Sequence, residues 1–233
     1  MSRFGYLGTP MPADASPPAQ ADAHACLLDA LGNRQAAVLS LSAGVLSAMQ
    51  LATRHPDRVS ALLLVVPLVW KPATLADSAP TPSPLAEALL MRLIGSDFVF
   101  WSALHVARDQ VIKRVLATPP EAVAAASPAE RARVNAMAND ILPVSARADG
   151  LRNESKVASH LQPYDLAALR APTLVVSARE DGYGTYAIAQ YTASRIPGAR
   201  FIGYERGGHS LVGHNEDMLQ HVAQLLATKR TEP

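Results

Sequence analysis

Continuous apolar runs of strand length constrain this fold more than any other feature of the sequence. Residues 61–66 read ALLLVV without interruption, and residues 173–178 and 36–41 have a similar character. Strands of a parallel sheet are covered by helices on both faces, so they show no regular alternation of polar and apolar residues. The sequence therefore predicts an α/β fold with a mostly parallel sheet and buried strands.

Between and around these runs, the chain is predicted as helices and loops. From residue 68 to residue 170 the sequence shows helical segments and no strand pattern. We therefore expect one core, made of residues 1–67 and 171–233, with a helical cap insertion at 68–170. After a loop at 1–15, the predicted elements are a helix at 16–31, a strand at 36–41, a helix at 43–55, a strand at 61–66, helices near 85–94, 98–116, 128–141 and 147–160, a strand at 173–178, a helix at 185–195, a strand at 199–204 and a helix at 215–226.

Composition limits the classes of function. The 233 residues carry 21 Lys and Arg against 20 Asp and Glu, a net charge of +1, and no basic run occurs. This balance favours neither nucleic acid nor an anionic membrane as a partner. The N-terminus has no apolar signal core and no run of 18 apolar residues exists, so we expect a cytoplasmic protein. A single cysteine, Cys26, excludes an intrachain disulfide, and its place on an apolar helical stripe predicts a core residue.

A serine lies where the first predicted strand turns into a helix. Ser42 has a small residue two positions before it, Ser40, and another two positions after it, Gly44. This is the small-x-Ser-x-small form of the nucleophile elbow, in which a sharp turn lifts the hydroxyl clear of the sheet. The N–H of the next residue, Ala43, would then lie beneath it as an oxyanion donor. The simpler interpretation is a strand–helix junction that happens to contain serines.

Two more titratable residues follow later strands. Asp181 comes after the strand at 173–178, and His209 comes after the strand at 199–204. In open parallel sheets, ligand chemistry gathers at the carboxyl ends of the strands. There the imidazole of His209 could take the proton of Ser42, and the Asp181 carboxylate could fix the tautomer of the imidazole.

Together these segments resemble the α/β-hydrolase family across nearly the whole chain. The segments that carry the resemblance are SLSAG at 40–44, HPDRV at 55–59 before an apolar strand, APTLVV at 171–176 ahead of Glu180-Asp181, and GGH at 207–209 ahead of a terminal helix. The resemblance implies that Ser42 is the nucleophile, Asp181 the acid and His209 the base. It also implies that residues 68–170 are the variable helical cap.

Each assignment has alternatives in the sequence. Ser40 and Ser47 compete with Ser42, Glu180 competes with Asp181, and His214 competes with His209. We expect His214 to be structural or on the surface. Packing or solvent exposure is expected for the histidines on predicted helices, namely His24, His55, His105, His160 and His221.

The chain departs from the resemblance near its start. Members of the family have several strands before the elbow, whereas only 35 residues precede the elbow strand here, and the sequence contains no His-Gly pair to supply a second oxyanion donor. The sheet is thus expected to be N-terminally incomplete, with the strand at 36–41 as an exposed apolar edge. Three explanations stay open: a truncated gene model, which we favour, a genuine fragment, or a homo-oligomer that covers the edge with a second copy.

The resulting expectation is a serine hydrolase that cleaves an ester or lactone bond of a small, apolar acyl substrate. We expect no cofactor and no metal, because neither metal-ligand spacing nor a phosphate-binding glycine loop occurs. Apolar residues of the insertion would form an acyl pocket or, equally, pack the cap against the core: Trp70, Phe98, Phe100, Trp101, Leu104 and Val106. The alternative function is a non-catalytic binding domain of the same fold.

Overall fold

Four parallel strands form one sheet in this protein, which we describe from a computed structural model over residues 2–75 and 95–228. Their order across the sheet follows the sequence: β1 (Ala36–Leu41), β2 (Val59–Val65), β3 (Thr173–Ala178) and β4 (Arg200–Tyr204). Each strand pairs in parallel with the next, for example Leu41 with Val65 and Val65 with Val176. The predicted α/β class and parallel sheet are confirmed.

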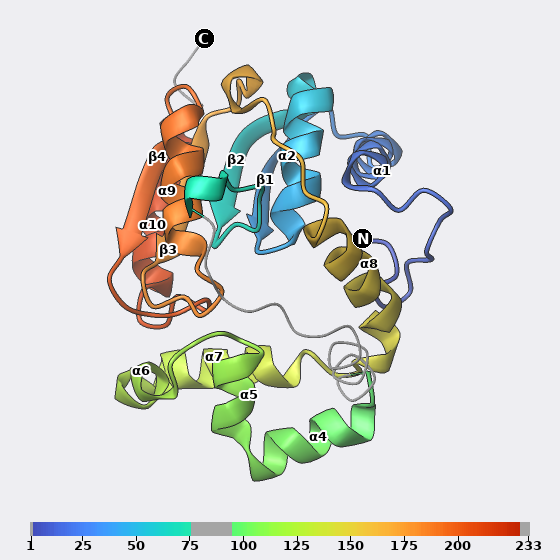
Figure 1. Ribbon diagram of the computed structural model, residues 1–233. Coiled ribbons are helices and arrows are strands. Elements are labelled where there is room, and N and C mark those ends of the chain that lie inside the picture. Colours follow the sequence, from blue (N-terminus) through green and yellow to red (C-terminus); the bar gives the residue numbers. More distant parts are fainter. Residues whose placement is uncertain (1, 76–94, 229–233) are drawn as a thin grey trace.

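Helices cover both faces of the sheet. On one face lie α2 (Gly44–Arg54) and α9 (Thr185–Arg195), with α1 (Pro17–Ala30) packed beside α2, and their apolar side chains enclose Leu62, Leu64 and Val175. On the other face lies α10 (Asn215–Thr228), which packs over Leu63 and Val176. Figure 1 shows the two layers on either side of the strands. Burial on both faces explains why polar and apolar residues do not alternate along β2 and β3.

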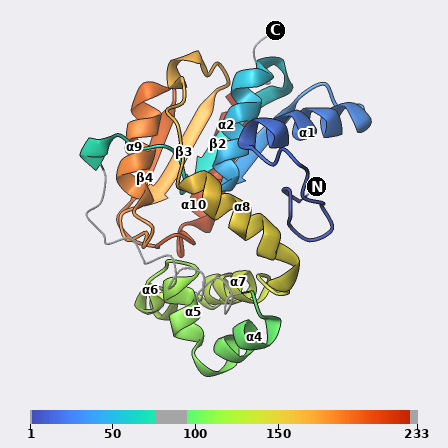
Figure 2. The same cartoon turned by 45° about the vertical axis from the view of Figure 1, so that its right-hand side comes forward.

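The remaining helices form a second layer beyond the carboxyl ends of the strands. They are α4 (Asp97–Val106), α5 (Arg108–Arg114), α6 (Pro120–Ala125) and α7 (Pro128–Asn139), followed by α8 (Ala148–Ala158), which leads back to the sheet. In Figures 1 and 2 the strand arrowheads point toward α4–α7. These four helices have small cores of their own, including Phe100, Leu104 and Val134.

One edge of the sheet is open in the described residues. β1 pairs with β2 alone, and Leu39 and Leu41 are 56% and 43% exposed. The prediction that residues 36–41 form a buried strand is wrong: Leu39 and Leu41 pair with Leu63 and Val65 in β2, but only the β2 side chains belong to the apolar core on that face. The prediction of an exposed apolar edge is confirmed.

Several helix predictions need correction. The helix predicted at 98–116 is broken at Ala107, which lies outside the α region between α4 and α5, and α6 was not predicted. In α1 the face against α2 includes Ala21 and Ala25, so Cys26, one position further round the helix, is exposed and the prediction of a core cysteine is wrong. The helix predicted near 85–94 lies outside the described residues.

No helix in the described ranges combines the length and the apolar character needed to cross a membrane.

Candidate active site

Ser42 sits in a strained turn between β1 and α2. Its φ is +52°, a left-handed conformation that costs a residue with a Cβ about 1–2 kcal/mol. Three hydrogen bonds hold the turn: the Ser42 N–H donates to the Val65 carbonyl at 3.0 Å, and the Ser42 carbonyl accepts from the N–H groups of Val45 at 3.1 Å and Leu68 at 3.2 Å. β2 and the loop after it therefore hold this serine in place.

Small residues flank Ser42 for two different reasons. Ser40 is 7% exposed, and its hydroxyl donates to the Leu63 carbonyl at 2.9 Å. A Cβ on Gly44 would lie 3.2 Å from Nη1 of Arg3, so the close neighbour there is the N-terminal loop and not the strand.

Beside these residues, the N–H of Ala43 has no hydrogen-bond acceptor within the described part of the chain. This donor is therefore available next to the Ser42 side chain.

The structure brings Asp181 and His209 together. Nδ1 of His209 lies 2.8 Å from Oδ2 of Asp181, and the two side chains are 12% and 0% exposed. The same Oδ2 accepts a short hydrogen bond from the Thr185 hydroxyl, and Oδ1 accepts from the Tyr183 N–H at 2.9 Å. A carboxylate bound at both oxygens has one orientation, and it fixes which imidazole nitrogen faces away from it.

Two neighbours of this pair were missed by the sequence analysis. Thr185, at the start of α9, also bonds Ser177 Oγ at 2.8 Å, so a buried hydroxyl chain leads into Asp181. The Tyr183 ring meets the His209 ring edge-on, with centroids 4.9 Å apart, and its hydroxyl donates to the Val115 carbonyl. Burial, together with the Asp181 charge, raises the pKa of Tyr183. The position of Thr185, four residues after Asp181 at a helix start, is the one signal that could have found it.

The rival residues point elsewhere. Glu180 lies 4.0 Å from Arg206 with a side chain that is 39% exposed, and the His214 ring stacks on Tyr204 at 3.9 Å between centroids. Ser47 bonds the Gly44 carbonyl of its own helix at 3.2 Å. None of them takes part in the Asp181–His209 hydrogen bond.

Ser42 lies at the carboxyl end of β1, and His209 follows β4. A cavity of about 190 Å³ reaches from Leu41, directly before Ser42, to His209, and Met137, Leu211 and Met218 are among its apolar lining residues. Among the described residues, neither Ser42 Oγ nor His209 Nε2 has a hydrogen-bond partner. The Ser42 hydroxyl and Nε2 of His209 are therefore both available to interact with a substrate.

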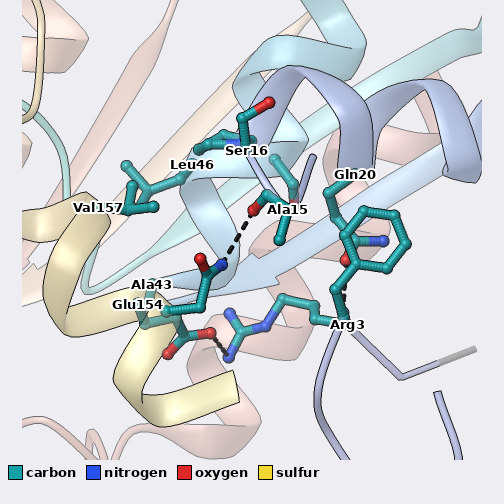
Figure 3. A pocket seen from close by; sticks show the side chains of 12 residues that line it. Arg3, Ala15, Ser16, Gln20, Ala43, Leu46, Glu154 and Val157 are labelled. Carbon is teal, nitrogen blue, oxygen red and sulfur yellow. Dashed lines mark hydrogen bonds and ion pairs between the residues drawn. The ribbon is translucent and has the colours of Figure 1, made fainter. Parts of the chain in front are cut away.

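Behind the elbow lies a second, smaller cavity of about 40 Å³, lined by Ala43 and by residues of the N-terminal loop, α1 and α8. Figure 3 shows the Arg3 guanidinium reaching toward Glu154 on α8, and their charged atoms are 2.5 Å apart. Burial raises the pKa of Glu154, and Arg3 opposes that rise. A space of this size holds a water molecule and no substrate. The N-terminal loop and α8 thus meet behind the elbow, around this cavity.

The apolar insertion residues predicted as an acyl pocket do not face one space. Phe100 and Leu104 are buried among α4, α5 and α7. By contrast, Phe98, Trp101 and Val106 are 75%, 49% and 88% exposed. Within the described residues no group of His, Cys, Asp and Glu is arranged to hold a metal ion.

Comparisons with known proteins agree with this fold. An α/β-hydrolase fold protein from Nakamurella multipartita is 26% identical, with 97% of this chain and 80% of that chain covered and a TM-score of 0.68. The enol-lactonase from Burkholderia xenovorans is 19% identical over 97% and 79% of the two chains (TM-score 0.67), and a thermophilic esterase from Thermogutta terrifontis is 20% identical over 97% and 78% (TM-score 0.62). A search of curated protein sequences gives no match. The family model for the alpha/beta hydrolase fold matches residues 4–215, and this chain therefore belongs to that family.

Proposed function

We propose that this protein is a serine hydrolase that cleaves an ester or lactone bond, with Ser42 as nucleophile, His209 as base and Asp181 as the acid that orients it. The observation that carries the proposal is the buried Asp181–His209 hydrogen bond at the same sheet edge as the strained turn of Ser42. The presence of an esterase and an enol-lactonase among the structural neighbours supports the reaction class.

In the first step, Ser42 Oγ forms a bond to the carbonyl carbon of the substrate while its proton passes to Nε2 of His209. The Asp181 carboxylate stabilises the imidazolium that results. Negative charge develops on the carbonyl oxygen, and the Ala43 N–H donates to it in this proposal, which is supported by the lack of another acceptor for that N–H among the described residues. The carbon–oxygen bond to the leaving group then breaks, and His209 returns the proton to the leaving oxygen.

In the second step, water attacks the acyl group on Ser42 and gives a proton to His209. The bond between the acyl carbon and Ser42 Oγ breaks, the proton returns to Ser42, and a carboxylic acid leaves. Every group needed for these steps is a side chain or a backbone N–H, so the proposed reaction uses no cofactor.

The proposed substrate is a small molecule with a short apolar acyl chain. The cavity beside His209, about 190 Å³, is smaller than the roughly 300–1,000 Å³ typical of pockets for drug-sized ligands, and most of its lining is apolar. We include in the proposal that residues 68–170 act as a cap, because α5–α7 lie beyond the carboxyl ends of the strands (Figure 1).

A panel of p-nitrophenyl esters tests the proposed function, with Ser42→Ala as the decisive variant. Ser47→Ala is the matched control, since Ser47 lies in α2 shortly after Ser42 and its hydroxyl donates to the Gly44 carbonyl of the same helix. Hydrolysis that is lost in the first variant and kept in the second supports the proposal. Equal rates in the wild type and Ser42→Ala would overturn it.

A non-catalytic binding domain is the second candidate. One observation favours it: no hydrogen bond joins Ser42 to His209 among the described residues. Under this alternative the ester panel shows no serine-dependent turnover, although a small ligand still protects the protein against thermal unfolding.

A further inference from the structure

The turns that carry Asp181 and His209 both rest on one segment of the helical layer, Leu116–Pro119 between α5 and α6 (the strut). The carbonyl of Ala117 accepts hydrogen bonds from the Gly182 N–H at 3.0 Å and from the His209 N–H at 3.2 Å. One of these donors follows Asp181 and the other belongs to His209 itself. A single carbonyl therefore holds the acid turn and the base turn at a fixed separation.

Thr118 makes the second contact of the strut. Its hydroxyl oxygen accepts from the Ser210 N–H at 3.0 Å and lies 2.8 Å from Ser210 Oγ, and the residue is 1% exposed. The backbones approach so closely that a Cβ on Gly208 would lie 2.6 Å from the Thr118 Cα, and Gly208 has a φ of +60°. A side chain at position 208 would push the strut away from the base turn.

Helix α7 holds the same turn through a second set of contacts. Arg133 donates to the Ser210 carbonyl at 2.9 Å, and it also donates to both carboxylate oxygens of Glu130. Glu130 in turn accepts from the Gly213 N–H at 2.8 Å, and Arg133 lowers the pKa of Glu130, which keeps it charged. Val212 is buried among apolar residues of α5, α6 and α7. The turn 207–213 is thus anchored in the helical layer at each end.

We propose that Thr118 and Arg133 are positioning residues, and that through them the helical layer sets the alignment of His209 with Asp181. The inference rests on the proposed function for its effect on turnover. Neither the Thr118 hydroxyl nor the Arg133 guanidinium has a hydrogen bond to Asp181 or to the His209 ring among the described residues. Both act by holding the backbone of Ser210, which follows His209.

Thr118→Val tests the inference, because it removes the hydroxyl and keeps the shape of the side chain. We expect kcat to fall by about 10- to 100-fold with little change in KM, since displacing a catalytic group by about 1 Å can cost about 10²-fold. The acidic limb of the kcat/KM profile should move to lower pH, because a misaligned carboxylate stabilises the imidazolium less. Thr118→Ser restores the hydroxyl and should recover most of the activity.

Thr192→Val is the matched control. Thr192 is a fully buried threonine of α9 whose hydroxyl bonds only the Ile188 carbonyl. It should lose stability and keep its pH profile. The inference is overturned if Thr118→Val keeps the wild-type kcat and profile, or if Thr192→Val loses as much activity as Thr118→Val.

A measurement that does not depend on turnover tests this inference separately from the proposed function. Proton NMR of the whole protein follows the hydrogen on Nδ1 of His209, and we expect it to exchange faster with solvent in Thr118→Val than in Thr192→Val. Equal exchange would overturn the inference, whereas loss of the proposed function would show instead as turnover that survives Ser42→Ala. Where Thr118→Val does not fold, Arg133→Met repeats the test, with Arg131→Met as its control because Arg131 bonds only carbonyls near α6.

Discussion

The two ends of the candidate site are built differently. Asp181 and His209 lie in turns that hydrogen-bond to each other, to α9 and to the strut, and both side chains are largely buried. Ser42 follows β1, which has one neighbouring strand in the described residues and exposes Leu39 and Leu41. The difference shows that the acid–base pair depends on α9 and on the helical layer, whereas the serine turn depends on β2 and the loop after it.

This contrast separates two kinds of substitution. At the acid–base end, a change of one hydrogen bond should appear in turnover, because the contacts converge on the Asp181 carboxylate. At the serine end, changes outside Ser42 should appear in stability or association, because they alter the sheet and its edge.

Asp181→Asn is expected to have the largest effect, a loss of about 10⁴-fold in kcat, since an amide at this position favours the wrong imidazole tautomer. Steady-state hydrolysis of a p-nitrophenyl ester measures it. Glu180→Gln is the control, because that side chain pairs with Arg206 at 4.0 Å and faces solvent. A loss in the control equal to that in Asp181→Asn would remove the distinction between the two carboxylates.

Thr185→Val sharpens the comparison at the same end. The variant loses a hydrogen bond to a charged group, worth about 1.5–3 kcal/mol. We expect this free energy to be lost from the stabilisation of the transition state, so that kcat drops by about 10- to 100-fold. Thr185→Ser keeps the hydroxyl and should be near wild type. Wild-type kcat in Thr185→Val would mean that Asp181 is held without it.

Acyl chain length probes the cavity that lies between the two ends. We expect p-nitrophenyl acetate or butyrate to be preferred to the octanoate by about 10-fold or more in kcat/KM, since one methylene in a closed pocket is worth about 1–3 kcal/mol. Met137→Ala enlarges the lining and should reduce that preference. A preference for octanoate in the wild type would contradict a short acyl pocket.

The open edge of β1 predicts self-association. We expect Leu39→Lys to shift the protein toward monomer by about 10-fold in the association constant, because burying a leucine is worth roughly 1.5–3 kcal/mol. Light scattering over a range of concentrations measures it, with Leu31→Lys, an exposed leucine away from the sheet, as the control. A wild-type protein that stays monomeric at high concentration would contradict this prediction.

Ser40→Ala should have the smallest effect. It removes the hydrogen bond to the Leu63 carbonyl and should lower the free energy of unfolding by about 1 kcal/mol. Urea denaturation measures the loss, and kcat should stay within about twofold of wild type, since the site itself is untouched. A fall in kcat comparable to that in Thr185→Val would erase the contrast between the two ends.

Local patterns in the sequence predicted much of this fold. The strands β2 and β3 are continuous apolar runs, and the elbow, Asp181 and His209 each come soon after the end of a strand, so short segments were enough to locate them. The pairing of Asp181 with His209 followed from one further rule, that parallel strands end at the same edge of a sheet.

What the sequence could not predict depends on contacts between distant segments. Thr118 and Ser210 are 92 positions apart, and nothing in either segment marks the other. The exposure of Cys26 depends on which face of α1 meets α2, and the aromatic residues of α4 divide between core and surface for the same reason. Such choices are made by packing and not by local propensity.

Labelling with a fluorophosphonate tests the central claim most directly, because the reagent reacts with a serine only when a neighbouring base activates it. The whole protein is labelled and the modified residue is mapped by mass spectrometry, alongside Ser42→Ala, His209→Ala and Ser47→Ala. We predict modification of Ser42 in the wild type and in Ser47→Ala, and none in the other two variants. Absence of labelling in the wild type, or labelling of Ser42 that persists in His209→Ala, would contradict an activated nucleophile at this elbow.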